Sequence, residues 1–145
     1  MPAWVNTACD DYAKRLPPEL KLGTRELPLI KRGKNADIAR IKRDECRQLL
    51  DAVPKNSRLI ALDVAGKKLS TEKLAAHLDD WMQQGQDIAI AIGGPDGFTR
   101  EFLQQVGMSI SLSDMTFPHP LVRVILTEQL YRAWSILANH PYHRG

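Results

Sequence analysis

Long apolar runs are absent from this sequence of 145 residues. No stretch approaches the roughly 20 apolar residues that cross a bilayer, and the N-terminus lacks the basic and then apolar layout of a secretion signal. Cysteine is also scarce, because Cys9 and Cys46 stand apart without CxxC spacing or neighbouring histidines. These absences argue against a disulfide framework and a metal site, and they predict a cytoplasmic protein with reduced thiols.

Motifs for phosphate binding and hydrolysis are missing as well. The chain contains no GxxxxGK[ST], and no GxGxxG follows an early strand, which disfavours a polyphosphate ligand. No nucleophile elbow, HExxH motif or ordered Ser-His-Asp set indicates hydrolysis. The net charge of +3 permits a nucleic-acid partner without requiring one. The remaining candidate is a ligand that is held largely by main-chain groups.

The apolar pattern predicts a single α/β domain over residues 1–145. Helical spacing, with caps or prolines at the ends, predicts helices over Pro2–Leu16, Asn35–Pro54, Ser70–Gly85 and Thr99–Gln105 and from Pro118 or His119 onward. Asn35 and Ser70 are the expected N-caps of the second and third helices.

Strands are predicted between these helices. The continuous apolar runs Arg58–Asp63 and Asp87–Ile92 are typical of parallel strands covered on both faces, and with the helix between them they predict a βαβ unit. Met108–Ser113 alternates as a strand with one less buried face does. Arg25–Ile30 is a candidate edge strand, because it contains a proline.

Glycine-containing loops follow these strands. Ligands of open parallel sheets bind beyond the carboxyl ends of the strands, so Gly66, Gly93–Gly97 and Leu112–Pro118 are expected to share one rim. Glycine there lets the main chain approach a ligand closely, although the same glycines serve equally well merely to turn the chain.

The last helix carries apolar residues on two sides. One stripe runs from Val122 to Leu137, and a shorter one holds Leu121, Val124, Tyr131 and Ala138. A helix apolar on two sides is buried by two neighbours, which in so small a protein predicts a partner subunit.

Several motifs, spread over essentially the whole chain, resemble the RlmH family of small SPOUT-class methyltransferases. They are Lys31–Ile38, Leu62-Asp63, Ile92–Gly97, Ser111–Ser113, Pro118–Val124, Glu128–Ser135 and Asn139–Arg144. The resemblance implies a homodimer, a parallel-rich sheet flanked by helices with a C-terminal trefoil knot, and methylation of N3 of a pseudouridine in large-subunit (23S) ribosomal RNA. Because so small a domain offers little RNA-binding surface of its own, assembled ribosomes are the expected substrate.

The resemblance also implies S-adenosyl-L-methionine as cofactor. By position, its contacts would be Leu62, Gly93 and the stretch Leu112, Ser113, Asp114, Met115, Thr116 and Phe117. Gly93 would leave room beside the strand end, and main-chain groups of the stretch would bind the adenine edge.

Catalytic side chains are few in such a site, so positioning of the reacting groups has to supply much of the rate. N3 of pseudouridine loses a proton on methylation, and His119 and Arg123 are candidates for a base or an anion-stabilising group. His119 would equally well cap the last helix, and Arg123 would equally well pair with a carboxylate.

Two clusters are candidates for RNA binding. Tyr142, His143 and Arg144 combine an aromatic ring with cationic groups, which suits stacking and phosphate contact, although a frayed C-terminus is the alternative. Lys31, Arg32 and Lys34 would extend a phosphate-binding rim, although a charged loop is usually only solvated.

The chain departs from the family pattern at both ends. Family members carry a hydrophobic strand before a segment like Met1–Val5, so the first strand is expected to be missing, and Gly145 stands where an acidic residue is usual. Two alternatives to the methyltransferase remain. One is a noncatalytic RNA- or ribosome-binding module of the same fold, and the other is an α/β enzyme that acts on a phosphate ligand.

Overall fold

The computed structural model of this chain describes residues 2–144. Their path divides into two compact units: unit 1 comprises Met1–Thr24, Leu69–Gly85 and Met115–Gly145, and unit 2 comprises Arg25–Lys68 and Gln86–Asp114. The departures expected at Met1 and Gly145 lie outside the described residues, and the single domain, the trefoil knot and the missing strand stay predictions.

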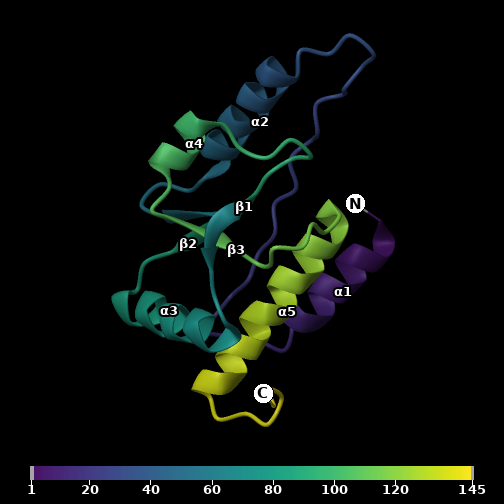
Figure 1. The fold of residues 1–145 in the computed structure, drawn as a ribbon. Helices are drawn as coiled ribbons and strands as arrows, with labels where there is room; N and C mark the ends of the chain where they lie inside the picture. Colours follow the sequence, from purple (N-terminus) through teal and green to yellow (C-terminus); the bar gives the residue numbers. More distant parts are fainter. Residues whose placement is uncertain (1, 145) are drawn as a thin grey trace. The chain divides into compact units, whose positions relative to one another are not determined.

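Unit 2 contains a parallel sheet. Over residues 2–144, the strands β1 (Arg58–Lys68), β2 (Ile88–Ile92) and β3 (Met108–Ser111) form one sheet in the order β2-β1-β3 (Figure 1). Both pairings of β1 are parallel. The chain connects β1 to β2 through α3 (Thr71–Gln84), which confirms the predicted βαβ connection and the α/β class.

Two helices pack on this sheet within unit 2. They are α2 (Ile38–Ala52) and α4 (Arg100–Gln105). Their shared core with the sheet holds Cys46, Leu59, Ala61, Ala91, Phe98 and Phe102. The rings of Phe98 and Phe102 are stacked, with centroids 4.6 Å apart, so the residue that follows the glycine-rich turn is anchored in the core.

Two local predictions in unit 2 are wrong. Arg25–Ile30 forms no strand, and the amide of Ile30 donates to the Glu45 carboxylate at 3.2 Å, where a strand would pair with main chain. The N-cap of α2 is Asp37 rather than Asn35, because the Asp37 side chain accepts from the amide of Arg40 at 3.2 Å. The predicted caps Ser70 and Gly85 of α3 are confirmed.

Strand β1 is longer than the predicted Arg58–Asp63. Leu62 is in register with Ile110, and Lys67 then faces the same Ile110, so the intervening residues bulge out of the ladder. Gly66 lies in this bulge, and a Cβ at Gly66 would lie 2.8 Å from main-chain atoms of Ser109 and Ile110. The close approach of two strands is therefore sufficient reason for glycine at this position, which lies within β1 and not in a loop after it as expected.

Gly66→Ala is expected to destabilise the protein by about 1–3 kcal/mol, because the added methyl group overlaps main chain that has little freedom to move. Denaturant unfolding measures the loss. Gly23→Ala is the matched control, since a Cβ at Gly23 meets nothing within 4 Å. Equal stabilities for the two variants would contradict the close approach of β1 and β3.

Unit 1 consists of helices and the C-terminal tail. The first helix, α1 (Ala3–Ala13), lies along α5 (His119–Leu137) in Figure 1, and α3 also packs against α5. The Tyr12 and Tyr131 rings join α1 to α5 with centroids 6.2 Å apart, and the Thr71 hydroxyl donates to Gln129 at 2.8 Å.

The two apolar sides of α5 thus meet α1 and α3 of the same chain. These stripes therefore do not by themselves require a partner subunit, because helices distant in the sequence supply neighbours for α5, and the homodimer stays a prediction. Leu121 and Leu137, at the two ends of α5, keep 39% and 36% of their surface exposed. No helix among residues 2–144 is long and apolar enough to cross a membrane.

Candidate functional site

The carboxyl ends of the three described strands lie at one edge of the sheet in unit 2. Leu62 is in register with Ile92 of β2 and with Ile110 of β3, and all three strands run in the same direction. The turn after β2 and the loop after β3 therefore leave the sheet at the same edge, as the sequence predicts. The side chain of Leu62 is buried there, with 9% of the residue exposed.

The turn after β2 is tight. The amide of Gly97 donates to the carbonyl of Gly94 at 3.0 Å, and Gly97 has a φ of 76°, which favours glycine. A Cβ at Gly93 would lie 3.2 Å from the Phe98 ring and 3.3 Å from the carbonyl carbon of Gly97. Packing of the turn against Phe98 is thus sufficient reason for glycine at 93, and the cofactor contact of Gly93 stays a prediction.

The loop after β3 begins at Leu112. Leu112 and Ser113 are partly buried, whereas Asp114 is exposed. The Ser111 hydroxyl donates to the carbonyl of Ser113 at 3.1 Å, which fixes the start of the loop. Met115, Thr116 and Phe117 belong to unit 1, and the contacts predicted for this whole stretch remain predictions.

An ion pair with a buried carboxylate lies beside the turn after β2. The Arg32 guanidinium donates to the two Glu45 carboxylate oxygens at 2.8 and 3.0 Å, and its Nε donates to Asp96 at 2.8 Å. Asp96 lies within the turn, and a Cβ at Gly94 would lie only 2.6 Å from Glu45 Oε1. Arg32, predicted to bind RNA, thus has its charge engaged by two carboxylates, while Lys31 and Lys34 are exposed.

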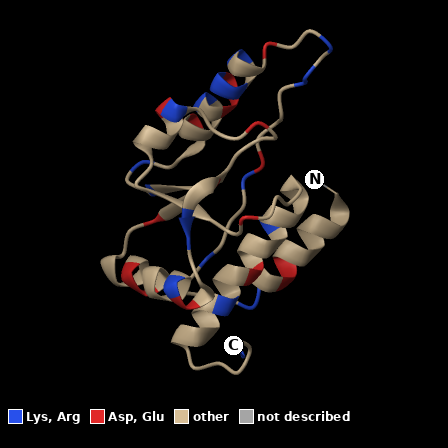
Figure 2. Ribbon diagram, in the orientation of Figure 1, with Lys and Arg blue, Asp and Glu red and all other residues tan. Residues whose placement is uncertain are grey.

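Glu45 was missed by the sequence analysis. Figure 2 shows acidic and basic residues mixed along α2, and most of them are exposed or half-buried. Glu45 instead lies one helical turn after Ile41 and one before Leu49, on the apolar stripe, and only 7% of it is exposed. An acidic residue on the apolar stripe of a predicted helix could have indicated a buried carboxylate with a cationic partner.

Hydrogen bonds from Arg32 lower the pKa of Glu45 below its ordinary value of 4.5, against the opposing effect of burial. A lowered pKa means that this carboxylate stabilises the fold above pH 4.5 and that its contribution is lost as the pH falls through the folded-state pKa. Glu45→Gln is expected to cost about 1.5–3 kcal/mol at pH 7, because a hydrogen-bonded charge is lost.

This difference in unfolding free energy between Glu45→Gln and the natural chain is expected to shrink as the pH falls below 4.5 and through the lowered folded-state pKa of Glu45. Denaturant unfolding at several pH values measures it. Arg40→Ala, which affects only the exposed partner Asp44 at 4.0 Å, controls for general charge effects on α2. A difference that stays constant with pH would contradict the buried pair.

His119 and Arg123 lie one turn apart at the start of α5, in unit 1. The helix begins at His119 itself with Pro118 as N-cap, so the alternative role of His119 as cap is wrong. The buried Nδ1 of His119 has no hydrogen-bond partner within the described part of the chain. This spacing places both side chains on the same face of α5.

The C-terminal tail is fastened to the helices of unit 1, so the frayed end considered above is not observed. The Tyr142 hydroxyl donates to Glu128 at 3.1 Å, and Nε2 of His143 lies 3.1 Å from Glu72. Arg132 joins the two, because its guanidinium lies 4.8 Å from the centre of the Tyr142 ring and 3.2 Å from Nδ1 of His143.

These contacts restrict what the tail residues are able to do. Burial, with hydrogen bonds to Tyr12 and Glu128, raises the pKa of Tyr142, so its hydroxyl stays protonated. One face of the Tyr142 ring is covered by Arg132, and stacking on a base there would require that contact to open. Arg144 is exposed, and the RNA contacts of all three residues stay predictions.

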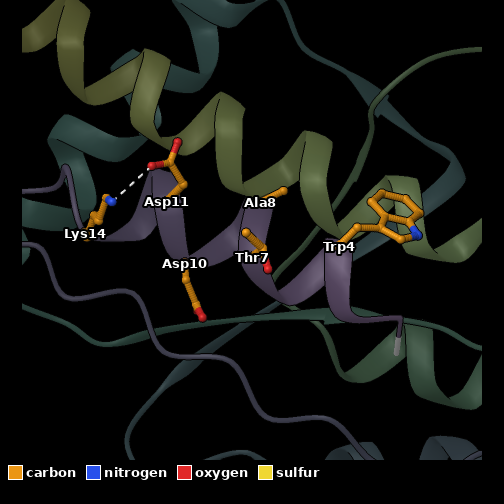
Figure 3. Close-up of a pocket in the computed structure, with 6 residues that line it drawn as sticks. All are labelled: Trp4, Thr7, Ala8, Asp10, Asp11 and Lys14. Atoms are coloured by element: carbon orange, nitrogen blue, oxygen red, sulfur yellow. Dashed lines mark ion pairs between the residues drawn. The ribbon is translucent and has the colours of Figure 1, made fainter.

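A shallow hollow also lies on α1, in unit 1 (Figure 3). It is lined by Trp4, Thr7, Ala8, Asp10, Asp11 and Lys14, with Lys14 paired to Asp11 at 3.2 Å. Trp4 is 53% exposed beside it. None of these six residues belongs to the predicted site.

Known proteins resemble this chain over nearly its whole length. Residues 1–143 match the family described as "Predicted SPOUT methyltransferase". Proteins named "Ribosomal RNA large subunit methyltransferase H" are similar: that of Thioalkalivibrio sulfidiphilus is 54% identical over 99% of this chain and 92% of its own length. That of Methylococcus capsulatus is 54% identical over 99% and 93%, and that of Hydrogenovibrio crunogenus is 50% identical over 99% and 92%.

A crystal structure of Archaeoglobus fulgidus Nep1 bound to S-adenosylhomocysteine matches 59% of this chain and 38% of its own, at 20% identity and a TM-score of 0.38. That likeness is too weak to bear on fold or activity. The family match and the relatives at 50–54% identity are decisive, and this chain belongs to the SPOUT methyltransferase family.

Proposed function

We propose that this protein methylates large-subunit (23S) ribosomal RNA, taking the methyl group from S-adenosylmethionine, and that the acceptor is N3 of a pseudouridine. The observation that carries the proposal is the match of residues 1–143 to a methyltransferase family, together with relatives named for ribosomal RNA methylation. The RNA is methylated within the assembled ribosome, because a chain of 145 residues offers little RNA-binding surface of its own.

The residues that unit 2 contributes to the proposed cofactor site lie at the sheet edge formed by the carboxyl ends of β2 and β3. Leu62 is the proposed apolar contact there, and the tight turn at Gly93 and the loop from Leu112 to Asp114 start at the same edge. An adenosine is held well by such a combination of apolar surface and main-chain donors and acceptors. Bound there, the cofactor supplies an electrophilic methyl group on a sulfonium.

The chain's own contribution to the reaction is positioning and handling of one proton. Holding the acceptor nitrogen in line with the methyl carbon and sulfur supplies up to roughly 7–11 kcal/mol in favourable intramolecular cases. His119, whose buried Nδ1 has no hydrogen-bond partner among residues 2–144, is the candidate to accept the N3 proton. Arg123, one turn further along α5, is the candidate to stabilise the resulting anion.

Methyl transfer from tritiated S-adenosylmethionine to purified ribosomes that lack the modification tests the proposal. Label is expected in large-subunit RNA at a pseudouridine, and intact ribosomes are expected to be better substrates than free RNA. Calorimetry with the methyl donor separates the alternatives. Binding of the donor would support the enzyme, no binding at high donor concentration would support the noncatalytic module, and binding of a nucleotide with indifference to the donor would support a phosphate-ligand enzyme.

We also propose a homodimer, which would pool two small RNA-binding surfaces. Lys31, Lys34 and Arg144 are exposed and are the candidate phosphate contacts, whereas Arg32, Tyr142 and His143 are engaged within the chain. Sedimentation equilibrium measures the oligomeric state. A monomer at assay concentration would overturn this part of the proposal while leaving the methyl-transfer assay independent of it.

A further inference from the structure

The glycine-rich turn after β2 is held from outside its own strand. Its two ends are joined by the Gly97 to Gly94 hydrogen bond, but one hydrogen bond does not determine where a turn points. Two further contacts do so within unit 2: the Glu45 carboxylate lies against the main chain of Gly94, and Arg32 holds the side chain of Asp96.

Arg32 and Glu45 form one connected cluster. Arg32 spans Glu45 and Asp96 with separate nitrogen atoms, and its Nη1 also donates to the carbonyl of Ile30 at 3.0 Å. Glu45 in turn accepts the amide of Ile30. The planar guanidinium suits this arrangement, because several donors in one plane reach two carboxylates at once, which a lysine ammonium does not reproduce.

The burial of Glu45 makes this cluster costly to disturb. A carboxylate that is 7% exposed must keep its partners, since an unpaired buried charge is strongly destabilising. Asp96, by contrast, has 35% of its side chain exposed, so its pair with Arg32 is not needed to solvate either group. The Arg32–Asp96 contact restrains the turn without being essential to the core.

We propose that Arg32, Glu45 and Asp96 are positioning residues that set the Gly93–Gly97 turn in the geometry required for binding the methyl donor. The inference rests on the proposed function, because it assigns the turn to the donor site. None of the three residues is proposed to touch the reacting atoms. Arg32 thereby takes a role on the methyl-donor side in place of its predicted role in RNA binding.

The test uses Asp96→Asn, Arg32→Ala and Arg32→Lys in the full chain, with Arg40→Ala as the matched control on α2. Dissociation constants for S-adenosylmethionine are measured by calorimetry, and the unfolding midpoint of each variant is measured in parallel. Asp96→Asn and Arg32→Lys are expected to raise the dissociation constant about tenfold and Arg32→Ala up to about 100-fold, as displaced binding geometry does. Arg40→Ala is expected to bind like the natural chain.

Asp96→Asn is expected to keep the unfolding midpoint of the natural chain, which separates positioning from a general loss of stability. The double variant Arg32→Ala with Asp96→Asn is expected to bind S-adenosylmethionine no more weakly than Arg32→Ala alone, because both changes break the same Arg32–Asp96 contact. Additive effects, or a natural dissociation constant in folded Asp96→Asn and Arg32→Ala, would overturn the proposal.

A second measurement does not depend on the donor. Hydrogen exchange of the Gly97 amide, which is bonded to Gly94, reports the turn directly in the ligand-free protein. Exchange is expected to become faster in Asp96→Asn and Arg32→Ala and to stay unchanged in Arg40→Ala. Unchanged protection in all variants would overturn the positioning role even if the natural chain binds no donor, whereas absence of donor binding with faster exchange would overturn only the proposed function.

Discussion

Replacing Gly93 by valine is expected to reduce methyl transfer by about 100-fold or more, since small displacements at a donor site have effects of that order. A Cβ at this position already lies 3.2 Å from the Phe98 ring and 3.3 Å from Gly97, so valine has to displace one of them or project from the edge of the sheet. Either outcome changes the turn beside which the donor is proposed to bind. Tritium transfer to ribosomes measures the activity.

Gly23→Val is the matched control, because a Cβ there meets nothing within 4 Å and Gly23 lies outside the proposed site. It is expected to retain natural activity. The unfolding midpoint of Gly93→Val distinguishes an inactive folded protein from an unfolded one. Natural activity in folded Gly93→Val would remove Gly93 from the cofactor site.

Two causes of a loss at Gly93 are separable. If crowding of Phe98 alone lowers the activity of Gly93→Ala, the double variant Gly93→Ala with Phe98→Leu is expected to be more active than Gly93→Ala. The reason is that leucine lacks the two ring carbons nearest the new methyl group. If the methyl group occupies space that the donor needs, activity stays low in the double variant. Calorimetry with S-adenosylmethionine on both variants gives the same distinction at the level of binding.

Phe102→Ala is expected to destabilise the protein by about 3–5 kcal/mol, the range for removing a large buried aromatic side chain. Phe102 is 1% exposed, and its ring stacks on Phe98 at 4.6 Å with the planes 4° apart. The loss is a large part of the roughly 5–15 kcal/mol that stabilises a typical domain. Denaturant unfolding of the full chain measures it.

Leu103→Ala, at the next position of α4, is the control for shortening a side chain on this helix. Leu103 is only partly buried, so a smaller loss is expected. Because Phe98 directly follows the turn, Phe102→Ala is also expected to speed hydrogen exchange at Gly97 beyond the effect of Leu103→Ala. Similar losses of stability in the two variants would contradict the central place of Phe102 in the core of unit 2.

The sequence by itself determined the helices and the three sheet strands and their order, although it also predicted a strand at Arg25–Ile30 that does not form. The apolar runs at 58–63 and 87–92 predicted two parallel strands, and Ser70 and Gly85 marked the ends of α3, because strand burial and helix caps depend on neighbouring residues. It also predicted that the loops after β2 and β3 leave one edge, since parallel strands have their carboxyl ends together.

Tertiary structure alone decided the pairings between residues distant in the chain. Arg32 looked like one cation of a basic loop until Glu45, 13 positions away, and Asp96, 64 positions away, were found beside it. Likewise, the two apolar sides of α5 did not reveal that α1 and α3 cover them. Periodicity shows that a side chain is buried, but only the folded path shows what buries it, because long-range contacts depend on the course of the whole chain.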